Sequence, residues 1–209
     1  MSIEDNKSLK INEIQIQEVE TSPELSRKLE VGSLKNVGEI VMTANRLIAL
    51  GKKIWKIVES GKPVVNMTSM QAVSVLPNQE ESEQPLDTFD LSHWSAPEVK
   101  SYQVNFKNGW GSSVIQMTYN VIFQYGGRYQ GEGRYLTGVN VVASDVSVGW
   151  GFEFDAVTKL ENISNVGSKE NPVSSAIISI EYTGKSTVSN ISSKESFYIT
   201  GEGEMRKLY

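Results

Sequence analysis

The stretch Ser113–Tyr125, SVIQMTYNVIFQY, decides the fold, because every second residue from Ile115 onward is large and apolar. Side chains on a β-strand point alternately to opposite faces, so this pattern predicts a long strand with one face in the core. The same alternation runs from Tyr102 to Phe106 and from Val146 to Ala156. Half-buried strands of this kind are typical of antiparallel sheets.

The alternation also predicts which side chains are buried, and further strands are expected near Ala176–Tyr182 and Glu195–Thr200. The predicted core side chains are Tyr102, Val104, Phe106, Met117, Tyr119, Val121, Phe123, Val148, Trp150, Phe152, Phe154, Ile178 and Ile180.

Glycine-containing segments between these runs predict the connections. Asn108-Gly109, followed by Trp110-Gly111, suits a hairpin because Asn-Gly readily adopts the positive φ angles of a tight turn. Gly126-Gly127 predicts the next turn, and Ala143–Asp145 predicts a bend. Gly149 and Gly151 fall on one face of an expected strand, which indicates a curved sheet.

Upstream, residues of about 34–60 have the spacing of one long amphipathic helix. Asn36 and Glu39 resemble a capping box, and Gly61 and Pro63 suit a helix end. At 100° per residue one arc is apolar and the opposite arc is basic. The apolar arc consists of Val37, Ile40, Val41, Ala44, Leu47, Ile48, Ile54, Trp55 and Val58.

These elements predict a mainly β protein: an antiparallel β-sandwich or partly closed barrel of about seven or more strands, with helix 34–60 packed on it. An α+β antiparallel sheet with the helix on one face is the alternative. Residues 1–31, with a short strand around Ile14 and Ile16 and a helical turn opening at Ser22-Pro23, are expected to form a partly flexible peripheral arm. Residues 32–209 are expected to form a single domain.

Composition removes several function classes. The 209 residues include no cysteine, which excludes disulfides, thiolate nucleophiles and zinc–cysteine sites. The net charge is -5, and residues 36–62 carry five bases against two acids, whereas 78–98 carry six acids and no Lys or Arg. Because the β region has no Lys/Arg cluster, we expect charge balance within the chain and no nucleic-acid partner.

The N-terminal residues carry acids and no apolar run, so the sequence indicates no signal peptide and no transmembrane segment. A cytoplasmic location is the default expectation, with export after removal of a signal as the alternative.

Groups with catalytic potential are few. His93 is the one histidine, and Asp87 and Asp90 are near it in sequence, but no activated-serine motif or metal-ligand spacing accompanies them. Glu153 and Asp155 are expected on one face of a strand, and with Glu132 they could form the carboxylate pair of a glycosidase. A solvent-exposed strand face explains the same residues. We therefore expect no catalytic residues, no metal and no cofactor.

The segment Tyr125–Tyr135, YGGRYQGEGRY, repeats Gly-Arg-Tyr and predicts a ligand-binding loop. Aromatic rings can stack on a ligand while arginine and glutamate hydrogen-bond it. The predicted binding residues are Arg128, Tyr129, Glu132, Arg134 and Tyr135. A hairpin whose tyrosines and arginines pack on the sheet is the alternative interpretation.

The helix provides a second route to recognition. A basic amphipathic helix with Lys52, Lys53, Trp55 and Lys56 could lie on an anionic membrane. The sequence thus favours a non-enzymatic binding or structural module that recognises a polar small molecule, a glycan or a protein through loop 125–135. A membrane-surface or pore-forming protein, and a carbohydrate-active hydrolase with paired carboxylates, are the alternatives.

Overall fold

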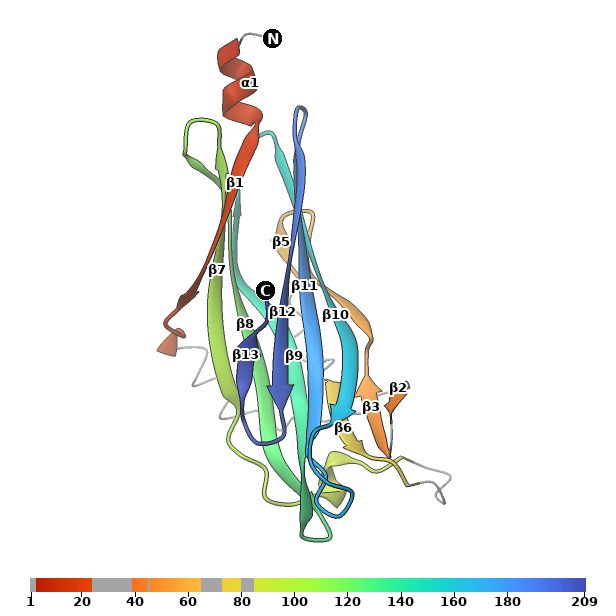
Figure 1. Ribbon diagram of the computed structural model, residues 1–209. Helices are drawn as coiled ribbons and strands as arrows, with labels where there is room; N and C mark the ends of the chain where they lie inside the picture. Colours follow the sequence, from red (N-terminus) through yellow and green to blue (C-terminus); the bar gives the residue numbers. More distant parts are fainter. Residues whose placement is uncertain (1–2, 24–38, 45, 65–72, 80–84) are drawn as a thin grey trace.

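The computed structural model describes residues 3–23, 39–44, 46–64, 73–79 and 85–209. These residues form an elongated body of two antiparallel sheets, of seven and six strands, with one short helix at one end (Figure 1). The predicted mainly β architecture is confirmed, and the described strands form no closed barrel.

The seven-stranded sheet has the order β1 (Ile11–Val19), β7 (Glu98–Asn108), β8 (Ser113–Tyr129), β9 (Glu132–Val148), β6 (Val73–Pro77), β3 (Leu47–Gly51) and β2 (Glu39–Ala44). The six-stranded sheet has the order β13 (Met205–Lys207), β12 (Asn190–Thr200), β11 (Ser174–Ser186), β10 (Phe152–Asn165), β4 (Ile54–Glu59) and β5 (Lys62–Pro63). Helix α1 covers Ile3–Leu9, and a 3-10 turn, η1, covers Thr88–Asp90.

Aromatic side chains from both sheets meet in the core. The ring centroids of Tyr102 on β7 and Phe197 on β12 are 5.0 Å apart. Those of Phe106 on β7 and Phe154 on β10 are 5.4 Å apart. Because each pair joins one sheet to the other, the sheets are held face to face by packed rings.

The buried faces follow the predicted alternation. In β7 and β8, Tyr102 lies opposite Tyr119 and Val104 opposite Met117. Every predicted core side chain is buried except three. Val148 and Phe152 are half-buried, and Trp150 is 94% exposed. The prediction for Trp150 is wrong because β9 ends at Val148 and Trp150 lies in a turn.

The hairpin predicted at residues 107–111 is present between β7 and β8. Its geometry differs from a two-residue Asn-Gly turn: the positive φ, 78°, occurs at Gly111. Asn108 Oδ1 accepts hydrogen bonds from the backbone N–H groups of Trp110 and Ser112, both at 3.0 Å. The asparagine therefore organises the turn with its side chain.

The other turns fall at different places from those expected. β8 and β9 are joined at Gln130-Gly131, and Gly126, with φ 80°, lies inside β8 where the register shifts. Around Ala143–Asp145 the pairing with β8 also shifts, as a bulge produces. Gly149 and Gly151 flank the β9–β10 turn, so they connect two strands rather than curve one.

The long helix of residues 34–60 is wrong over its described part, residues 39–44 and 46–60. This part forms β2 and β3 of the seven-stranded sheet and β4 of the six-stranded sheet. In β4, Trp55 and Ile57 are buried while Ile54 and Lys56 are exposed, which is the period of a strand. The chain turns at Arg46, where φ is 55°, and again at residues 52–53. β2 and β4 are rich in β-branched residues, which favour strands over helices.

The short strand expected around Ile14 and Ile16 is present as β1, which pairs with β7 along its length. Ile11 at its start is 4% exposed and belongs to the core. The helical turn expected from Ser22-Pro23 through Leu29 falls mainly on residues 24–29, outside the described residues. The division into an arm and one domain stays a prediction.

Candidate functional site

Helix α1 caps the end of the molecule where three hairpins meet, β7–β8, β9–β10 and β11–β12 (Figure 1). On the side of the seven-stranded sheet, Gly109 N–H donates to the Lys7 carbonyl at 3.0 Å, and Asn108 Nδ2 donates to the Ser8 carbonyl at 2.9 Å. On the other side, Ser186 Oγ donates to the Leu9 carbonyl at 2.6 Å. The helix is thus fastened to both sheets.

Two tryptophans project from this end, and each lies between two glycines. Gly109-Trp110-Gly111 forms the β7–β8 turn, and Gly149-Trp150-Gly151 forms the β9–β10 turn. Trp110 is 56% exposed and Trp150 is 94% exposed. Because glycine has no side chain, nothing adjacent in sequence covers either ring. Large aromatics of this protein are otherwise mostly buried, so two exposed rings at one end mark a candidate contact surface.

An open groove of about 480 Å³ lies beside Trp150. Its apolar wall is made by Leu9, Val114, Phe152 and Trp150, and its polar rim by Ser8, Ser113 and Asn108. The amide of Asn108 is already engaged in the turn and with Ser8, so the rim provides mainly hydroxyl groups. Trp110 does not line this groove.

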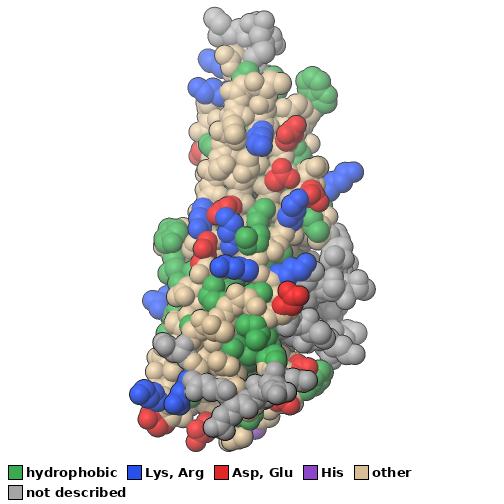
Figure 2. Space-filling model, turned by 90° about the vertical axis from the view of Figure 1, so that its right-hand side faces the viewer, with side chains coloured by type: hydrophobic (Ala, Val, Ile, Leu, Met, Phe, Trp, Pro, Cys, Tyr) green, Lys and Arg blue, Asp and Glu red, His purple; other side chains and the backbone are tan. Residues whose placement is uncertain are grey.

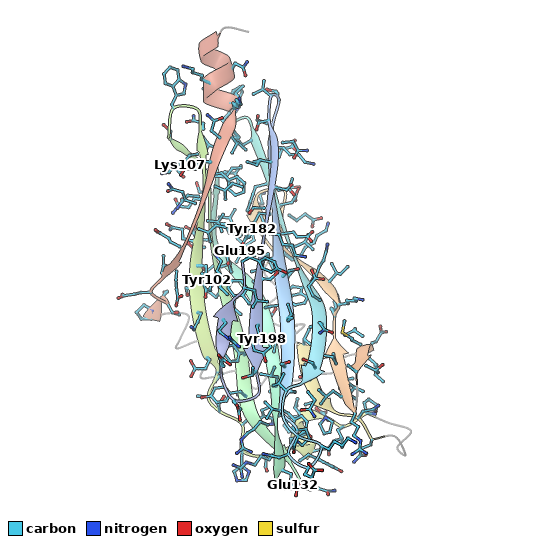
Figure 3. All side chains as sticks on the ribbon, viewed as in Figure 1. Tyr102, Lys107, Glu132, Tyr182, Glu195 and Tyr198 are labelled. Atoms are coloured by element: carbon cyan, nitrogen blue, oxygen red, sulfur yellow. The ribbon has the colours of Figure 1, made fainter. Side chains whose placement is uncertain are left out.

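One lysine lies over one of the two rings. Lys7 Nζ lies 5.5 Å from the centroid of the Trp110 ring, a cation–π distance. Lys107 lies near the same end (Figure 3), where it is opposite Glu13, and Lys185 is opposite Glu153 in the sheet register. Along the side of the molecule that Figure 2 faces, basic and acidic side chains are intermixed.

Comparisons with protein-family models, with curated proteins and with solved structures find no match.

The predicted ligand-binding loop, residues 125–135, lies at the opposite end, where Figure 3 shows Glu132. It is not a separate loop. It consists of the end of β8, the turn at Gln130-Gly131 and the start of β9. Glu132 is exposed, Arg128, Tyr129 and Arg134 are half-buried, and Tyr135 is buried. The five residues are near one another in the chain but do not all face solvent.

Several of their backbone and side-chain polar groups form hydrogen bonds within the protein. Arg128 exchanges two backbone hydrogen bonds with Ser92, and Arg134 N–H donates to the Pro172 carbonyl at 2.8 Å. Gln79 Nε2 donates to the hydroxyl of Tyr129. Tyr135 folds over Gly133, and burial, followed by the nearby Glu132 charge, raises the pKa of its phenol. Tyr135 therefore has a packing role.

His93 is exposed and adopts φ 66°, and its Nδ1 is 2.8 Å from Ser92 Oγ. Asp87 and Asp90 are engaged in capping η1: Thr88 N–H donates to Asp87 Oδ1 at 2.5 Å, and Asp87 N–H donates to Asp90 Oδ2 at 2.7 Å. These hydrogen bonds of Asp87 and Asp90 are local turn contacts and do not involve His93.

The three carboxylates considered for glycoside hydrolysis are not brought together. Glu132 begins β9, whereas Glu153 and Asp155 follow its other end, and a strand of 17 residues spans roughly 55 Å. Glu153 and Asp155 are both exposed, and Asp155 Oδ1 accepts a hydrogen bond from Ser60 N–H at 2.9 Å. They lie on a solvent-exposed strand face.

The residues assigned to a membrane-binding helix lie in the β3–β4 turn and on β4. Lys52 and Lys53 lie in the β3–β4 turn, and Lys56 is exposed on β4. Trp55 is 9% exposed and donates from Nε1 to the Val141 carbonyl at 3.3 Å. Across the described ranges, no helix has the length and apolarity needed to cross a membrane. The same residues include no cluster of three His, Asp or Glu side chains suited to a metal ion.

Two features escaped the sequence analysis although signals for them exist. The repeated tripeptide Gly-Trp-Gly identifies both exposed turns. The alternation of β12 places Glu195 on the same face as Phe197 and Ile199, and Glu195 is 1% exposed between the sheets. A carboxylate at a core position of a strand indicates a buried polar contact.

Proposed function

We propose that the protein is a non-enzymatic binding module that engages its ligand through the α1 end of the molecule. The observation that carries this proposal is the pair of Gly-Trp-Gly turns, which present Trp110 and Trp150 to solvent at the same end. Exposed tryptophans are costly for solubility and are typical anchors of binding interfaces.

Rigid support for the two rings favours this role. Trp110 is carried by a turn that Asn108 holds, and Trp150 by a turn whose Gly149 N–H donates to the Val114 carbonyl at 2.8 Å. A contact surface on hairpins fixed to a sheet loses little conformational entropy when it binds. The candidate catalytic groups, by contrast, are dispersed or engaged in turns.

The end with loop 125–135 is the second candidate. Phe89 shortly precedes Ser92, which pairs with Arg128 of this loop, and its side chain is 73% exposed; Arg128 and Glu132 also reach the surface. It ranks second because Tyr135 and the hydroxyl of Tyr129 are already engaged within the protein.

The test compares two variants with the wild-type protein on a glycan array and on vesicles of phosphatidylcholine with and without phosphatidylserine. Trp110→Ala combined with Trp150→Ala removes the proposed anchors, and Phe89→Ala is the matched control, an exposed aromatic at the other end. We expect a probe that binds the wild-type protein to bind Phe89→Ala equally and the double variant much more weakly. Equal binding by the double variant, or no binding of any probe by the wild-type protein, would contradict the proposal.

A further inference from the structure

The strands at the edges of the two sheets differ in length. Three of them are short: β2 has six residues, β13 has three and β5 has two. β1 has nine residues, and among the described strands it pairs with β7 alone. It contains no lysine and no proline, the residues that commonly protect an edge from pairing with another chain. We infer that β1 is a self-association surface, at which β1 of a second copy of this chain adds as an antiparallel strand.

The backbone groups of β1 that face away from β7 follow from the adjoining hairpin. Asn108 N–H donates to the Ser112 carbonyl at 2.9 Å, so Asn108 directs its backbone groups toward β8. Because successive residues of a strand direct these groups to opposite sides, Lys107 faces β1, where it lies opposite Glu13. The residues of β1 that bond to β7 are therefore Glu13, Gln15 and Gln17. Those that direct their N–H and C=O groups to the open edge are Ile14, Ile16 and Glu18.

This open edge is complementary to itself. Two edges pair when residues that both face outward lie opposite each other. Alignment of the whole strand, with Ile11 opposite Val19 of the second copy, meets this condition. It places Ile14 opposite Ile16 of the second copy, and the twofold axis passes beside Gln15. Any shifted register leaves residues of β1 without a partner.

The side chains of the inner face suit this alignment. Ile14 and Ile16 lie opposite Phe106 and Val104 of β7, which are core residues, and both isoleucines are half-buried. The two Ile14–Ile16 contacts between the copies would cover these isoleucines further. Burial of apolar side chains across the added strand favours association.

The side chains of the solvent face also suit it. Glu13 lies opposite Gln17 of the second copy, and the two Gln15 side chains meet at the axis. An amide can donate to a carboxylate and can pair with another amide. Like charges therefore do not lie opposite each other, which would oppose pairing.

The other charge of β1, Glu18, lies opposite Tyr102 on the inner face. A charge at such a position can protect an edge. In the whole-strand alignment it meets Asn12 of the second copy, whose amide can donate to it. Asn12 lies where the register of β1 shifts, so the regular part of the new ladder covers residues 13–17. A ladder this short gives a dimer that dissociates on dilution.

The geometry of the dimer leaves the α1 end free. Helix α1 directly precedes β1 in the chain, and the two copies of β1 run in opposite directions. The two α1 ends therefore point away from each other. Self-association through β1 occupies neither Trp110 nor Trp150, and the dimer carries both turns twice.

Sedimentation equilibrium over a wide range of protein concentration measures the association, and we expect a monomer–dimer equilibrium for the wild-type protein. Gln15→Lys places two ammonium groups opposite each other at the axis and should weaken the dimer about fivefold. Gln17→Lys is the matched control on the same exposed face. It creates two pairs with Glu13 of the second copy, so the dimer should become about fivefold tighter. Circular dichroism checks the folding of each variant.

Two further measurements test the alignment itself. Gln15→Glu alone should weaken the dimer as Gln15→Lys does, whereas an equimolar mixture of the two variants should associate at least as tightly as the wild-type protein. Amide hydrogen exchange followed by NMR should slow at Ile14 and Ile16 as the protein concentration rises. Exchange at Gln15 and Gln17, which already bond to β7, should not change.

A wild-type protein that stays monomeric at every concentration would overturn the inference. Equal effects of Gln15→Lys and Gln17→Lys would also overturn it, because they would assign the association to another surface. Trp110→Ala with Trp150→Ala should leave the dimer unchanged, and loss of association in that variant would assign the contact to the α1 end instead. The ligand test of the α1 end uses different probes, so the proposed function and this inference can fail separately.

Discussion

Tyr119 on β8 and Glu195 on β12 are joined by a hydrogen bond across the core, with the phenol donating to Glu195 Oε2 at 2.7 Å. Tyr182 on β11 donates to the same oxygen, and Figure 3 shows it beside Glu195 in the middle of the molecule. Lys207 on β13 forms an ion pair with the other carboxylate oxygen. One buried carboxylate thus links strands of both sheets and the C-terminal edge strand.

Lys207→Met is expected to lower the free energy of unfolding by about 2–3 kcal/mol, because it leaves the charge of Glu195 buried without its cation. The side chain of Lys207 is 38% exposed and that of Glu195 is 2% exposed, so the expected loss of stability is smaller than for a fully buried pair. Urea unfolding measures it. Lys56→Met, which removes an exposed ion pair with Glu59, is the control and should leave the midpoint unchanged. Adding Glu195→Gln to Lys207→Met should recover part of the loss; no recovery would contradict the buried-charge explanation.

Alkaline pH is expected to destabilise the protein through the same cluster. Burial, followed by the charges of Glu18 and Glu195, raises the pKa of Tyr102 to about 12. Burial and neighbouring Glu195 also raise the pKa values of Tyr119 and Tyr182 from 10.0. Above pH 10.0 the unfolded chain therefore loses phenolic protons that the folded protein retains. Stability is fully present below that pH and falls as the pH rises toward the folded pKa values.

Unfolding midpoints measured from neutral pH to above pH 10.0 check this, with tyrosinate absorbance as the second readout. Tyr182→Phe should reduce the steepness of the alkaline loss, although it lowers stability at neutral pH. Tyr198→Phe, a half-buried tyrosine of β12, is the control. An unchanged slope in Tyr182→Phe would contradict the assignment.

Truncation of two tryptophans is expected to have very different effects on stability. Trp55→Ala removes a ring that is 9% exposed and hydrogen-bonded to Val141, so it should cost about 3–5 kcal/mol. Trp150→Ala removes a ring that is 94% exposed and should change stability by no more than about 0.5 kcal/mol. Thermal unfolding of the two variants measures the difference. Comparable losses would mean that Trp150 is packed in solution.

Replacement of Gly201, which packs against Arg134 away from the α1 end, is expected to lower stability. A Cβ on Gly201 would lie 2.1 Å from the carbonyl oxygen of Arg134, and backbone atoms cannot easily yield. Gly201→Ala should therefore cost about 3 kcal/mol by overpacking. Gly131→Ala is the comparison: φ is 87°, but no atom lies within 4 Å, so only backbone strain of about 1–2 kcal/mol is expected. Denaturant titrations that rank the two variants the other way would contradict this packing.

Asn108→Asp is expected to loosen α1 while it preserves the β7–β8 turn. An aspartate still accepts from Trp110 and Ser112, but it cannot donate to the Ser8 carbonyl. Hydrogen exchange should become faster across residues 3–10 and stay unchanged in β8. Asn105→Asp is the control, because Asn105 is on the same strand and hydrogen-bonds with Gln103 and Ser113. Faster exchange in both variants would indicate a general charge effect.

The alternating apolar residues predicted strands in the regions of β7, β8, β10, β11 and β12, because burial on one face of a sheet imposes period two directly on the sequence. The same logic could not locate where a strand ends. Val148, Trp150 and Phe152 keep the alternation through a turn, so Trp150 was assigned to the core. The two glycines beside it, and their recurrence around Trp110, distinguish the turn from the strand.

The helix of residues 34–60 failed for a related reason. Three short strands placed one after another also bring apolar residues to spacings of three and four, which imitates a helical arc. The β-branched content of Ile40–Thr43 and Ile54–Val58, and the interruption at Gly51-Lys52-Lys53, were the contrary signals. The candidate sites were harder still, because the ends of the molecule are assembled from hairpins far apart in the chain.

The attachment of α1 has a consequence for the order in which the protein folds. The hydrogen bond between Ser186 Oγ and the Leu9 carbonyl joins residues 177 positions apart. During synthesis Leu9 emerges well before its partner Ser186, and such non-local closures are slow. The attachment of α1 to the six-stranded sheet is therefore delayed until Ser186 has emerged. Until Ser186 meets Leu9, Ile11 and the wall of the groove remain uncovered. This part of the structure is completed by a late contact between distant residues rather than by local propensity.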